Sequence, residues 1–392
     1  MKILVVAPTP FFSDRGTHIR ILEEALALEK RGAEVTIATY HIGAKLPQHL
    51  NTKIDVRRIR RLLFWYKKLE AGPDWQKIIL DLMLIKKTFF LARTWKPDII
   101  HGHLHEGALI GFIVQKALFW RKIKLVADFH GSLTKEMASH SYLRASGLMK
   151  FFEMIERFID TLGDAAVASS WDNIARINTA RKHDPARILL DGTRLSMFEG
   201  QPEASLARAA YRIPQEKVVI VYTGALIANK GIKLLLDAVP IICARYQEAH
   251  FVIAGFPVDQ ITEYVKQAIF KTRVTIISPL SYFELPKILC MSDIGVDPKE
   301  SDTRQASGKM LQYMGAGLPI ACFDTQNNRE YLADGGIYAG ETTPEGLALA
   351  IGELISSREL RQVKGSINRQ RAKIFSWEAS AEKLEKIYND IS

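Results

Sequence analysis

Residues Ser307 to Met310 could bind an anion, because they begin a short predicted helix over 308–315. Apolar residues follow at helical spacing, and Gly317 is expected to end the helix. The first N–H groups of a helix lack backbone acceptors, so they can donate to a phosphate. Lys309 lies where the helix dipole disfavours a cation, which an anionic ligand would explain. The alternative is an ordinary helix, capped by Ser307, with a solvated lysine.

Histidines lie at the ends of two predicted strands. His103 and His105 follow one buried strand, and His130 follows another. Alternating histidines share one face of a strand, but no other residues have ligand spacing, so we predict no metal site. Open α/β sheets bind ligands at the carboxyl ends of their strands, which places these side chains near a ligand. For His130 the alternative is a strand-end histidine with its hydrogen bonds satisfied inside the protein.

The first elements have the pattern of a βαβ unit: a strand over 2–8, a helix over 18–31 and a strand over 34–40. Gly16 is the only glycine in the first loop, so the nicotinamide or flavin fingerprint G-x-G-x-x-G is absent. Gly16 would still let a ligand approach the backbone closely. A plain strand-to-helix connection is the alternative.

A chain of 392 residues is too long for one ordinary core. Strand and helix patterns repeat after residue 201, which predicts two doubly wound α/β domains around one cleft. We expect a first domain over 1–195, a second over 196–372, and a C-terminal helix over 373–392 that returns to the first. Further helices are predicted over 148–162, 232–246 and 377–391.

The net charge of +10 is unevenly placed. Residues 1–190 carry 30 Lys and Arg against 19 Asp and Glu, whereas the remaining residues carry 23 against 24. In the stretch 53–68, basic residues lie on both sides of an apolar and aromatic run over 62–66, which suits peripheral contact with an anionic membrane. No nucleic-acid motif accompanies the charge, so no nucleic-acid partner is predicted. A solvated basic face is the alternative.

Cys243, Cys290 and Cys322 lie in apolar surroundings without metal-ligand spacing. They are typical of reduced core residues in a cytoplasmic protein. The first apolar run is too short for a signal peptide, and no apolar run reaches 18 residues. We therefore expect a cytoplasmic protein that contacts at most the inner face of the membrane.

Nine segments, in order, resemble those of retaining glycosyltransferases of family 4, which have the GT-B fold. They are the Gly16 loop, KPDIIHGH, DFHG, DAAVASS, ILLDGTRLSMF, VYTGALIANKGIKLLLDAV, FVIAGF, SDIGVDP and KMLQYMGAGLPI. The resemblance implies two Rossmann-like domains and transfer of a hexose or N-acetylhexosamine from a UDP- or GDP-sugar. The implied acceptor is a glycan or lipid-linked molecule in cell-surface polysaccharide or glycolipid synthesis. No metal or other cofactor is implied.

The resemblance also assigns roles on the donor side. Lys230 matches the family lysine that stabilises the leaving diphosphate, whereas the family arginine is replaced by Ala225, next to Gly224. The start of the helix at 307–310, including Lys309, would then provide more of the interactions that stabilise the anionic diphosphate. The family's pair of glutamates maps to Arg304 and Gln312. Gln312 could still bind the ribose, and Arg304 could supply the missing cation.

On the acceptor side, the resemblance places His130 beside the transferred sugar and Gly16 beside the diphosphate or acceptor. Arg15, His103 and His105 are expected to line the acceptor side. In place of the first family glutamate, Glu300 or Asp302 could supply an acid. The predicted catalytic residues are thus His130 and Lys230.

The three substitutions at Ala225, Arg304 and Gln312 leave a second interpretation open. The chain could be a degenerate, non-catalytic nucleotide-sugar-binding subunit of a transferase complex. A nucleotide-sugar epimerase is a third candidate, but it needs catalytic acids across the cleft, and the sequence does not show them.

Overall fold

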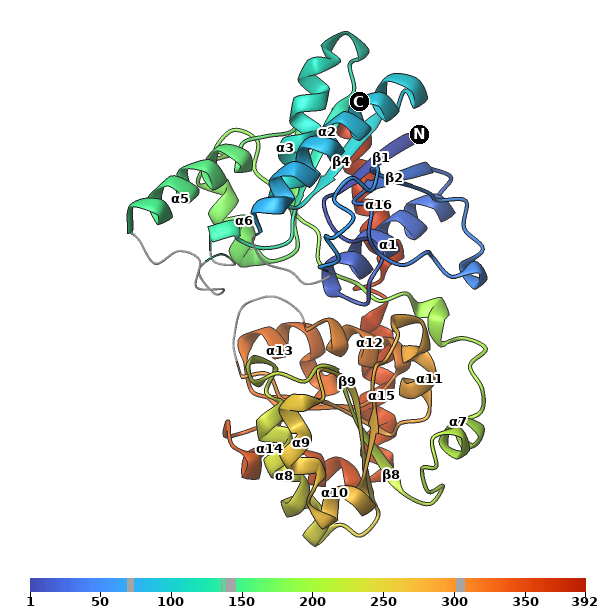
Figure 1. Cartoon of the computed structure of the whole chain (residues 1–392). Coiled ribbons are helices and arrows are strands. Elements are labelled where there is room, and N and C mark those ends of the chain that lie inside the picture. The colour runs from blue at the N-terminus through green and yellow to red at the C-terminus, as the bar shows by residue number, and fades with distance from the viewer. Residues whose placement is uncertain (69–73, 135–136, 138–145, 301–306) are drawn as a thin grey trace. The chain divides into compact units, whose positions relative to one another are not determined.

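The computed structural model describes residues 1–68, 74–134, 137, 146–300 and 307–392. The chain forms two compact units (Figure 1). Unit 1 contains Met1–Asp191 and Trp377–Ser392, and unit 2 contains Gly192–Ser376. The sequence analysis placed these two boundaries after residues 195 and 372. Two predicted residues, Asp302 and Arg304, lie outside the described part of the chain.

In the described part of unit 1, seven parallel strands form one sheet in the order β3-β2-β1-β4-β5-β6-β7. The strands are β1 Lys2–Ala7, β2 Glu34–Thr39, β3 Asp55–Arg58, β4 Ile99–His103, β5 Lys124–Phe129, β6 Ala165–Ala168 and β7 Arg187–Ile188. The order reverses between β1 and β4, which are paired in register with Val6 opposite Gly102. The loops that leave β1 and β4 therefore diverge at this point, and open α/β sheets bind ligands there.

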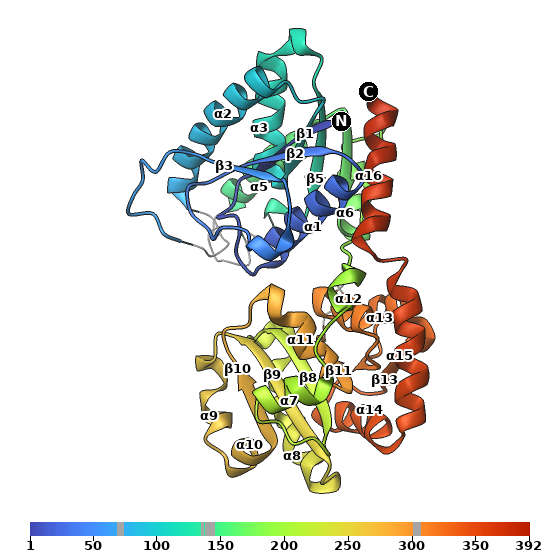
Figure 2. The same cartoon turned by 90° about the vertical axis from the view of Figure 1, so that its right-hand side faces the viewer.

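The helices of unit 1 cover both faces of its sheet. They are α1 Gly16–Lys30, α2 Trp75–Trp95, α3 Leu104–Ala117, α5 Ser146–Asp160, α6 Trp171–Asn178 and α16 Trp377–Ile391, with short 3-10 helices η1 Gln48–Leu50 and η2 Phe119–Arg121. Helix α3 packs between α2 and α5, whereas α1 packs against α16 on the other face (Figure 2). Helix α16 has the predicted length and returns to unit 1, as expected, because Leu384, Ile387 and Tyr388 are buried there.

The described part of unit 2 repeats the architecture with a six-stranded sheet in the order β10-β9-β8-β11-β12-β13. Its strands are β8 Val218–Ala225, β9 Ala249–Phe256, β10 Val274–Ile277, β11 Ile294–Asp297, β12 Ile320–Phe323 and β13 Gly336–Ala339. This order has its reversal between β8 and β11, so unit 2 also has one ligand-binding edge of this kind. The prediction of two doubly wound parallel sheets is confirmed.

The helices of unit 2 are α7 Ala204–Ala210, α8 Ile232–Arg245, α9 Thr262–Val265, α10 Ala268–Arg273, α11 Leu285–Cys290, α12 Gly308–Ala316, α13 Gln326–Leu332, α14 Pro344–Ser356 and α15 Arg358–Ala372. Short 3-10 helices are η3 Leu195–Phe198, η4 Ala228–Lys230, η5 Asp259–Ile261, η6 Tyr282–Glu284 and η7 Ala333–Gly335. The core lies where α8 and α14 pack on the sheet, around Leu235, Val239, Ile253 and Leu354. Gly317 ends α12 in the left-handed conformation, as predicted.

The cysteines agree with a reduced core. Cys243 and Cys322 are buried, Cys290 is partly buried, and all three are free. Within the described residues, no helix is long and apolar enough to cross a membrane.

Candidate functional site

The loop after β8 carries the predicted donor-binding lysine of unit 2. It follows β8, in which Gly224 is exposed near the end, and runs through η4 to Gly231. Gly231 has φ +73°, and a Cβ there would lie 1.7 Å from the carbonyl oxygen of Pro298. Only glycine permits this contact. The loop therefore packs against the backbone that follows β11, and this holds Lys230 at the point where the strand order reverses.

Lys230 has an ammonium group without a counter-ion. Its side chain is partly buried, and it forms no ion pair or hydrogen bond with the described residues. Burial lowers the pKa of Lys230, and the positive charge of Lys309 lowers it further, whereas the negative charge of Asp297 partly offsets both effects. A bound anion would reverse both effects, because an opposite charge favours the protonated form.

Lys309, in contrast, already has an anion inside the protein. Its side chain is only 9% exposed, and its Nζ lies 3.3 Å from Asp297 Oδ1. The ammonium also lies 4.0 Å from the ring centroid of Tyr222. Burial alone would lower the pKa of Lys309, but Asp297 and Tyr222 raise it. The position of this lysine at a helix start is therefore explained by Asp297, and its contact with a donor stays a prediction.

The start of α12 leaves room for a ligand. Ser307 occupies the N-cap position, but its side chain accepts no hydrogen bond from the first turn, so the predicted cap is not formed. A Cβ on the exposed Gly308 would meet nothing within 4 Å. Met310 is buried, so only its backbone N–H could face a ligand. An anion could approach these first amides closely.

Gln312 lies deeper than its predicted role requires. It is buried, and its Oε1 accepts a hydrogen bond of 3.0 Å from Thr193 Oγ1. Its oxygen thus already has a partner within unit 2. Binding of a ribose by Gln312 stays a prediction. Ala225, which stands in place of the family arginine, is partly exposed.

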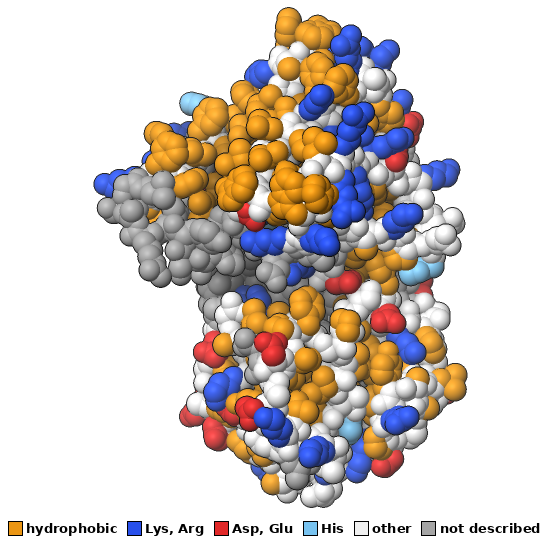
Figure 3. Space-filling model, viewed as in Figure 1, with side chains coloured by type: hydrophobic (Ala, Val, Ile, Leu, Met, Phe, Trp, Pro, Cys, Tyr) orange, Lys and Arg blue, Asp and Glu red, His pale blue; other side chains and the backbone are white. Residues whose placement is uncertain are grey.

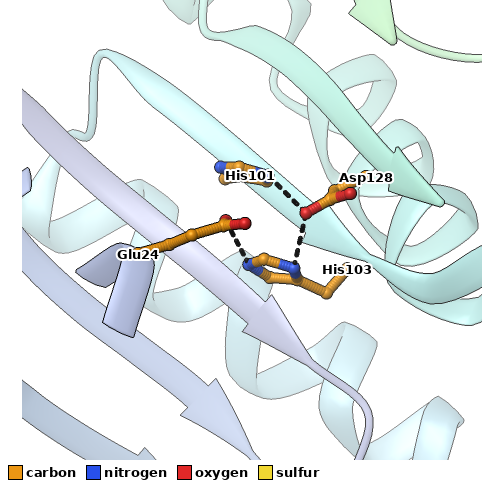
Figure 4. A group of neighbouring side chains, drawn as sticks. All are labelled: Glu24, His101, His103 and Asp128. Atoms are coloured by element: carbon orange, nitrogen blue, oxygen red, sulfur yellow. Dashed lines mark ion pairs between the residues drawn. The ribbon is translucent and has the colours of Figure 1, made fainter. Parts of the chain in front are cut away.

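In unit 1, a buried network of charged residues lies beside the reversal point of the sheet (Figure 4). Arg20 on α1 donates two hydrogen bonds of 3.1 Å to Asp128 at the end of β5, and it lies 2.9 Å from Glu24. It also donates to Asp191, at 2.8 Å. Burial alone would raise the pKa of Asp128, but Arg20 holds it well below its usual value. Burial raises the pKa of Glu24.

Two stacked histidines complete the network. The rings of His101 and His103 are parallel, with centroids 4.4 Å apart. His103 Nδ1 lies 3.2 Å from Asp128 Oδ2, and its Nε2 lies 4.0 Å from Glu24. Tyr388 on α16 is hydrogen-bonded to His101 Nδ1 at 2.5 Å. Burial, helped by His101, lowers the pKa of His103 to about 3, so His103 is neutral near pH 7.

His130 lies at the edge of this network. Its Nε2 is 3.0 Å from His103 Nδ1 and 3.5 Å from Asp128 Oδ2, so one of the two rings donates to the other. Its side chain is 9% exposed, and its Nδ1 has no hydrogen-bond partner among the described residues. The network orients His130 through Nε2, and its Nδ1 is itself buried, so a ligand would reach this nitrogen only after a local rearrangement.

Of the remaining residues predicted on the acceptor side, some are accessible to solvent and the others are buried. Arg15 is partly exposed at the N-cap of α1, and a Cβ on the neighbouring Gly16 would meet nothing within 4 Å. Contacts with the described residues therefore do not require a glycine at position 16. His103 and His105 are buried, and His105 Nε2 lies 3.5 Å from Asp160 on α5. Neither histidine faces solvent, so direct acceptor contact by either one would require a rearrangement.

The group Glu24, His101, His103 and Asp128 has the geometry of a possible metal site, since ligand atoms of all four lie within 4.8 Å of one another. The Arg20 guanidinium already contacts both carboxylates, however. Positive charge is thus present without a metal ion. The prediction of metal-independent chemistry remains a prediction.

The sequence analysis missed Arg20, Glu24, Asp128 and Asp297. One signal was available: Arg20 and Glu24 are spaced i, i+4 on the apolar side of the predicted helix, where unpaired charges would be costly. Asp128 and Asp297 end predicted strands, but the sequence does not show which cation each one meets.

Both units match known families. Residues 15–190 match Glycosyltransferase Family 4, and residues 217–357 match Glycosyl transferases group 1. Spore coat protein SA of Bacillus subtilis is 29% identical over 202 residues, which are 48% of this chain and 53% of that protein. D-inositol 3-phosphate glycosyltransferase of Corynebacterium glutamicum is 24% identical over 399 residues, covering 96% of this chain and 91% of that protein.

The fold has solved counterparts. Anabaena Alr3699/HepE in complex with UDP-glucose matches with a TM-score of 0.72 at 15% identity, covering 100% of both chains. Together with the two reversed parallel sheets, this likeness shows the GT-B fold. The chain belongs to glycosyltransferase family 4, and it is a glycosyltransferase.

Proposed function

We propose that the protein transfers a hexose or N-acetylhexosamine, with retention of configuration, from a UDP- or GDP-sugar bound by unit 2. One observation carries this proposal: Lys230 has a partly buried ammonium group that forms no ion pair with the described residues, and it lies at the ligand-binding edge of the sheet. The accessible start of α12 would bind the same anion. The UDP-glucose complex of the HepE structure supports a nucleotide sugar as the ligand.

The chemistry needs stabilisation of a leaving diphosphate. The bond between the anomeric carbon and the donor phosphate oxygen breaks while the acceptor oxygen bonds to the same face of the sugar. The acceptor proton passes to the departing phosphate oxygen. Lys230 and the first amides of α12 stabilise the charge that develops on the diphosphate. His130, held by Asp128 and His103, offers Nδ1 to the sugar or acceptor after a local rearrangement.

The proposed acceptor is a glycan or lipid-linked molecule, used in cell-surface polysaccharide or glycolipid synthesis. The excess of basic residues in unit 1 and the stretch 53–68 support peripheral attachment at the inner membrane face. Arg15 and Gly16 are the accessible residues that could contact the donor or the acceptor.

The experiment is a panel of thermal shifts with UDP, GDP, ADP and the common UDP- and GDP-sugars. Lys230→Ala is compared with Lys233→Ala, which alters an exposed lysine one turn away that pairs with Asp237. We expect one nucleotide class to stabilise the wild type and Lys233→Ala, and to bind Lys230→Ala at least about tenfold more weakly. Equal stabilisation of all three proteins would remove Lys230 from the site.

A non-catalytic nucleotide-sugar-binding subunit is the second candidate, supported by Ala225 and Gln312 at family positions. It predicts donor binding without hydrolysis or transfer to any acceptor. Release of nucleoside diphosphate by the wild type, lost in Lys230→Ala and His130→Ala, would exclude it.

A further inference from the structure

One side of unit 1 carries a group of large apolar side chains that no described residue covers. We call it the apolar face. Its members are Leu62, Phe64, Trp65, Trp75, Ile78, Leu82, Phe151, Met154 and Phe158, each at least half exposed. In Figure 3 the hydrophobic side chains gather over α2 and α5, with Lys and Arg around them.

The helices of this face are apolar on two sides. On α2, Leu80 and Leu84 pack into the core, whereas Trp75, Ile78 and Leu82 point outward at helical spacing. Helix α5 repeats the arrangement, with Ile159 buried and Phe151, Met154 and Phe158 outward. A helix on the surface of a protein normally has polar side chains on the side that faces solvent. The outer sides of both helices therefore suit a second apolar phase.

The segment before α2 extends the same face. Leu63 and Tyr66 are buried against Leu80 and Leu84, so they anchor the segment. Their neighbours Leu62, Phe64 and Trp65 project outward. Trp65 Nε1 donates a hydrogen bond of 3.0 Å to Gln76 Oε1 on α2, which joins the segment to the helix.

The charge around the face identifies its partner. Residues 53–96 contain twelve Lys and Arg against four Asp and Glu, and α5 adds Lys150 and Arg157, both exposed. A second copy of this chain would bring two such basic faces together, and their repulsion opposes a symmetric dimer. An anionic bilayer accepts both features, because aromatic side chains insert at headgroup depth and basic ones attract anionic lipids.

We propose that the apolar face of unit 1 docks on an anionic lipid bilayer, with α2 and α5 lying in the headgroup region. This deepens the proposed function, since it brings unit 1 to a lipid-linked acceptor. It does not depend on the donor site, so a failure at Lys230 and a failure at this face are distinguishable.

The first test uses co-sedimentation of the full chain with phosphatidylcholine vesicles that contain no phosphatidylglycerol or about a third of it. Ile78→Gln/Leu82→Gln places two polar, helix-compatible side chains on the face. The matched control Leu206→Gln/Leu349→Gln changes two leucines of unit 2 that are equally exposed. We expect the first variant to bind anionic vesicles at least about tenfold more weakly than wild type, and the control to bind normally.

A second pair tests the charge. Lys86→Gln/Lys150→Gln removes two exposed cations beside the face, and Lys266→Gln/Lys271→Gln removes two exposed cations of unit 2. The first variant should lose about fivefold affinity per charge for anionic vesicles at low salt, without a change on neutral vesicles. Wild-type binding should weaken as salt rises.

Several outcomes would overturn the proposal. They are no binding of wild type to anionic vesicles at low salt, or equal binding by Ile78→Gln/Leu82→Gln. Conversion of a wild-type dimer to monomer by that variant, seen by light scattering, would instead assign the face to self-association. If the variant unfolds, quenching of wild-type tryptophan fluorescence by brominated lipids, reduced in Trp75→Phe, decides the question, and unquenched fluorescence rejects the proposal.

Discussion

Asp297 and Lys309 form an ion pair inside unit 2, and the side chains of both residues are almost fully buried. Tyr222 packs over the ammonium group, and Tyr313 accepts a hydrogen bond of 2.8 Å from the Thr223 amide beside it. The pair ties the end of β11 to the first turn of α12. It therefore sets the position of the amides that we propose bind the donor.

Asp297→Asn should destabilise unit 2 by about 3–5 kcal/mol, because it leaves the Lys309 charge buried and unpaired. The measurement is denaturant unfolding of the full chain. Adding Lys309→Met should recover much of the loss, since it removes the orphaned charge. Glu382→Gln, which breaks an exposed pair with Lys386, is the control and should have no measurable effect. Equal stability of Asp297→Asn and wild type would contradict the pairing.

At the scale of elements, two glycine-containing loops meet the reversal points of the sheets for different reasons. Gly231 is required by the fold, because its φ is positive and Pro298 lies where a Cβ would be. Gly16 begins α1 with open space in front of it. A methyl group at Gly16 would therefore contact no described residue of the protein.

Gly231→Ala should lower the thermal stability of unit 2 and weaken nucleotide-sugar binding together. Gly16→Ala should leave the unfolding temperature within about 2 °C of wild type, because an exposed first-turn alanine is well tolerated in a helix. If a donor or acceptor approaches α1, Gly16→Ala should still lower kcat/KM by about tenfold or more. Normal turnover by Gly16→Ala would show that nothing approaches closely there.

The hydroxyl group of Tyr388 on helix α16 contacts the buried network of unit 1. Tyr388→Phe removes the hydrogen bond to His101 Nδ1 and leaves a buried nitrogen without a partner. We expect a loss of about 1–3 kcal/mol of stability in unit 1. Hydrogen exchange should then rise in α16 and in β4. Tyr264→Phe, in unit 2, is the control and should leave exchange in α16 unchanged. Unchanged stability of Tyr388→Phe would show that this hydrogen bond has no net effect.

At the scale of the whole molecule, buried neutral histidines make stability depend on pH. Burial lowers the pKa of His18 and of His250 to about 4, and that of His103 to about 3, from an ordinary 6.5. Below pH 6.5 the unfolded chain binds protons that the folded chain does not, so stability falls as pH falls. Each histidine should cost about 2 kcal/mol at pH 5 relative to pH 8.

The measurement is the thermal unfolding midpoint of each unit between pH 8 and pH 5. His250→Gln should flatten the curve of unit 2 while unit 1 keeps its slope. An equal pH dependence of unit 2 with and without His250 would contradict this assignment.

The architecture of this protein could be predicted from local sequence patterns. Strand and helix periods and the turn glycines are local properties, so they predicted the two doubly wound sheets and the returning helix of residues 377–391. Gly317 ended its helix as predicted because only the local backbone conformation matters there. Helix α2 was missed, because apolar residues on both of its sides hide the amphipathic pattern.

The tertiary structure decided which charges are already paired. Lys230 and Lys309 look alike in the sequence, but only the fold brings Asp297 within 3.3 Å of Lys309 and leaves Lys230 without an ion pair among the described residues. It likewise buries His103 and leaves His130 at the edge of the network. Pairing depends on contacts between residues far apart in the chain, and these are set by the packing of strands and helices rather than by spacing along the sequence.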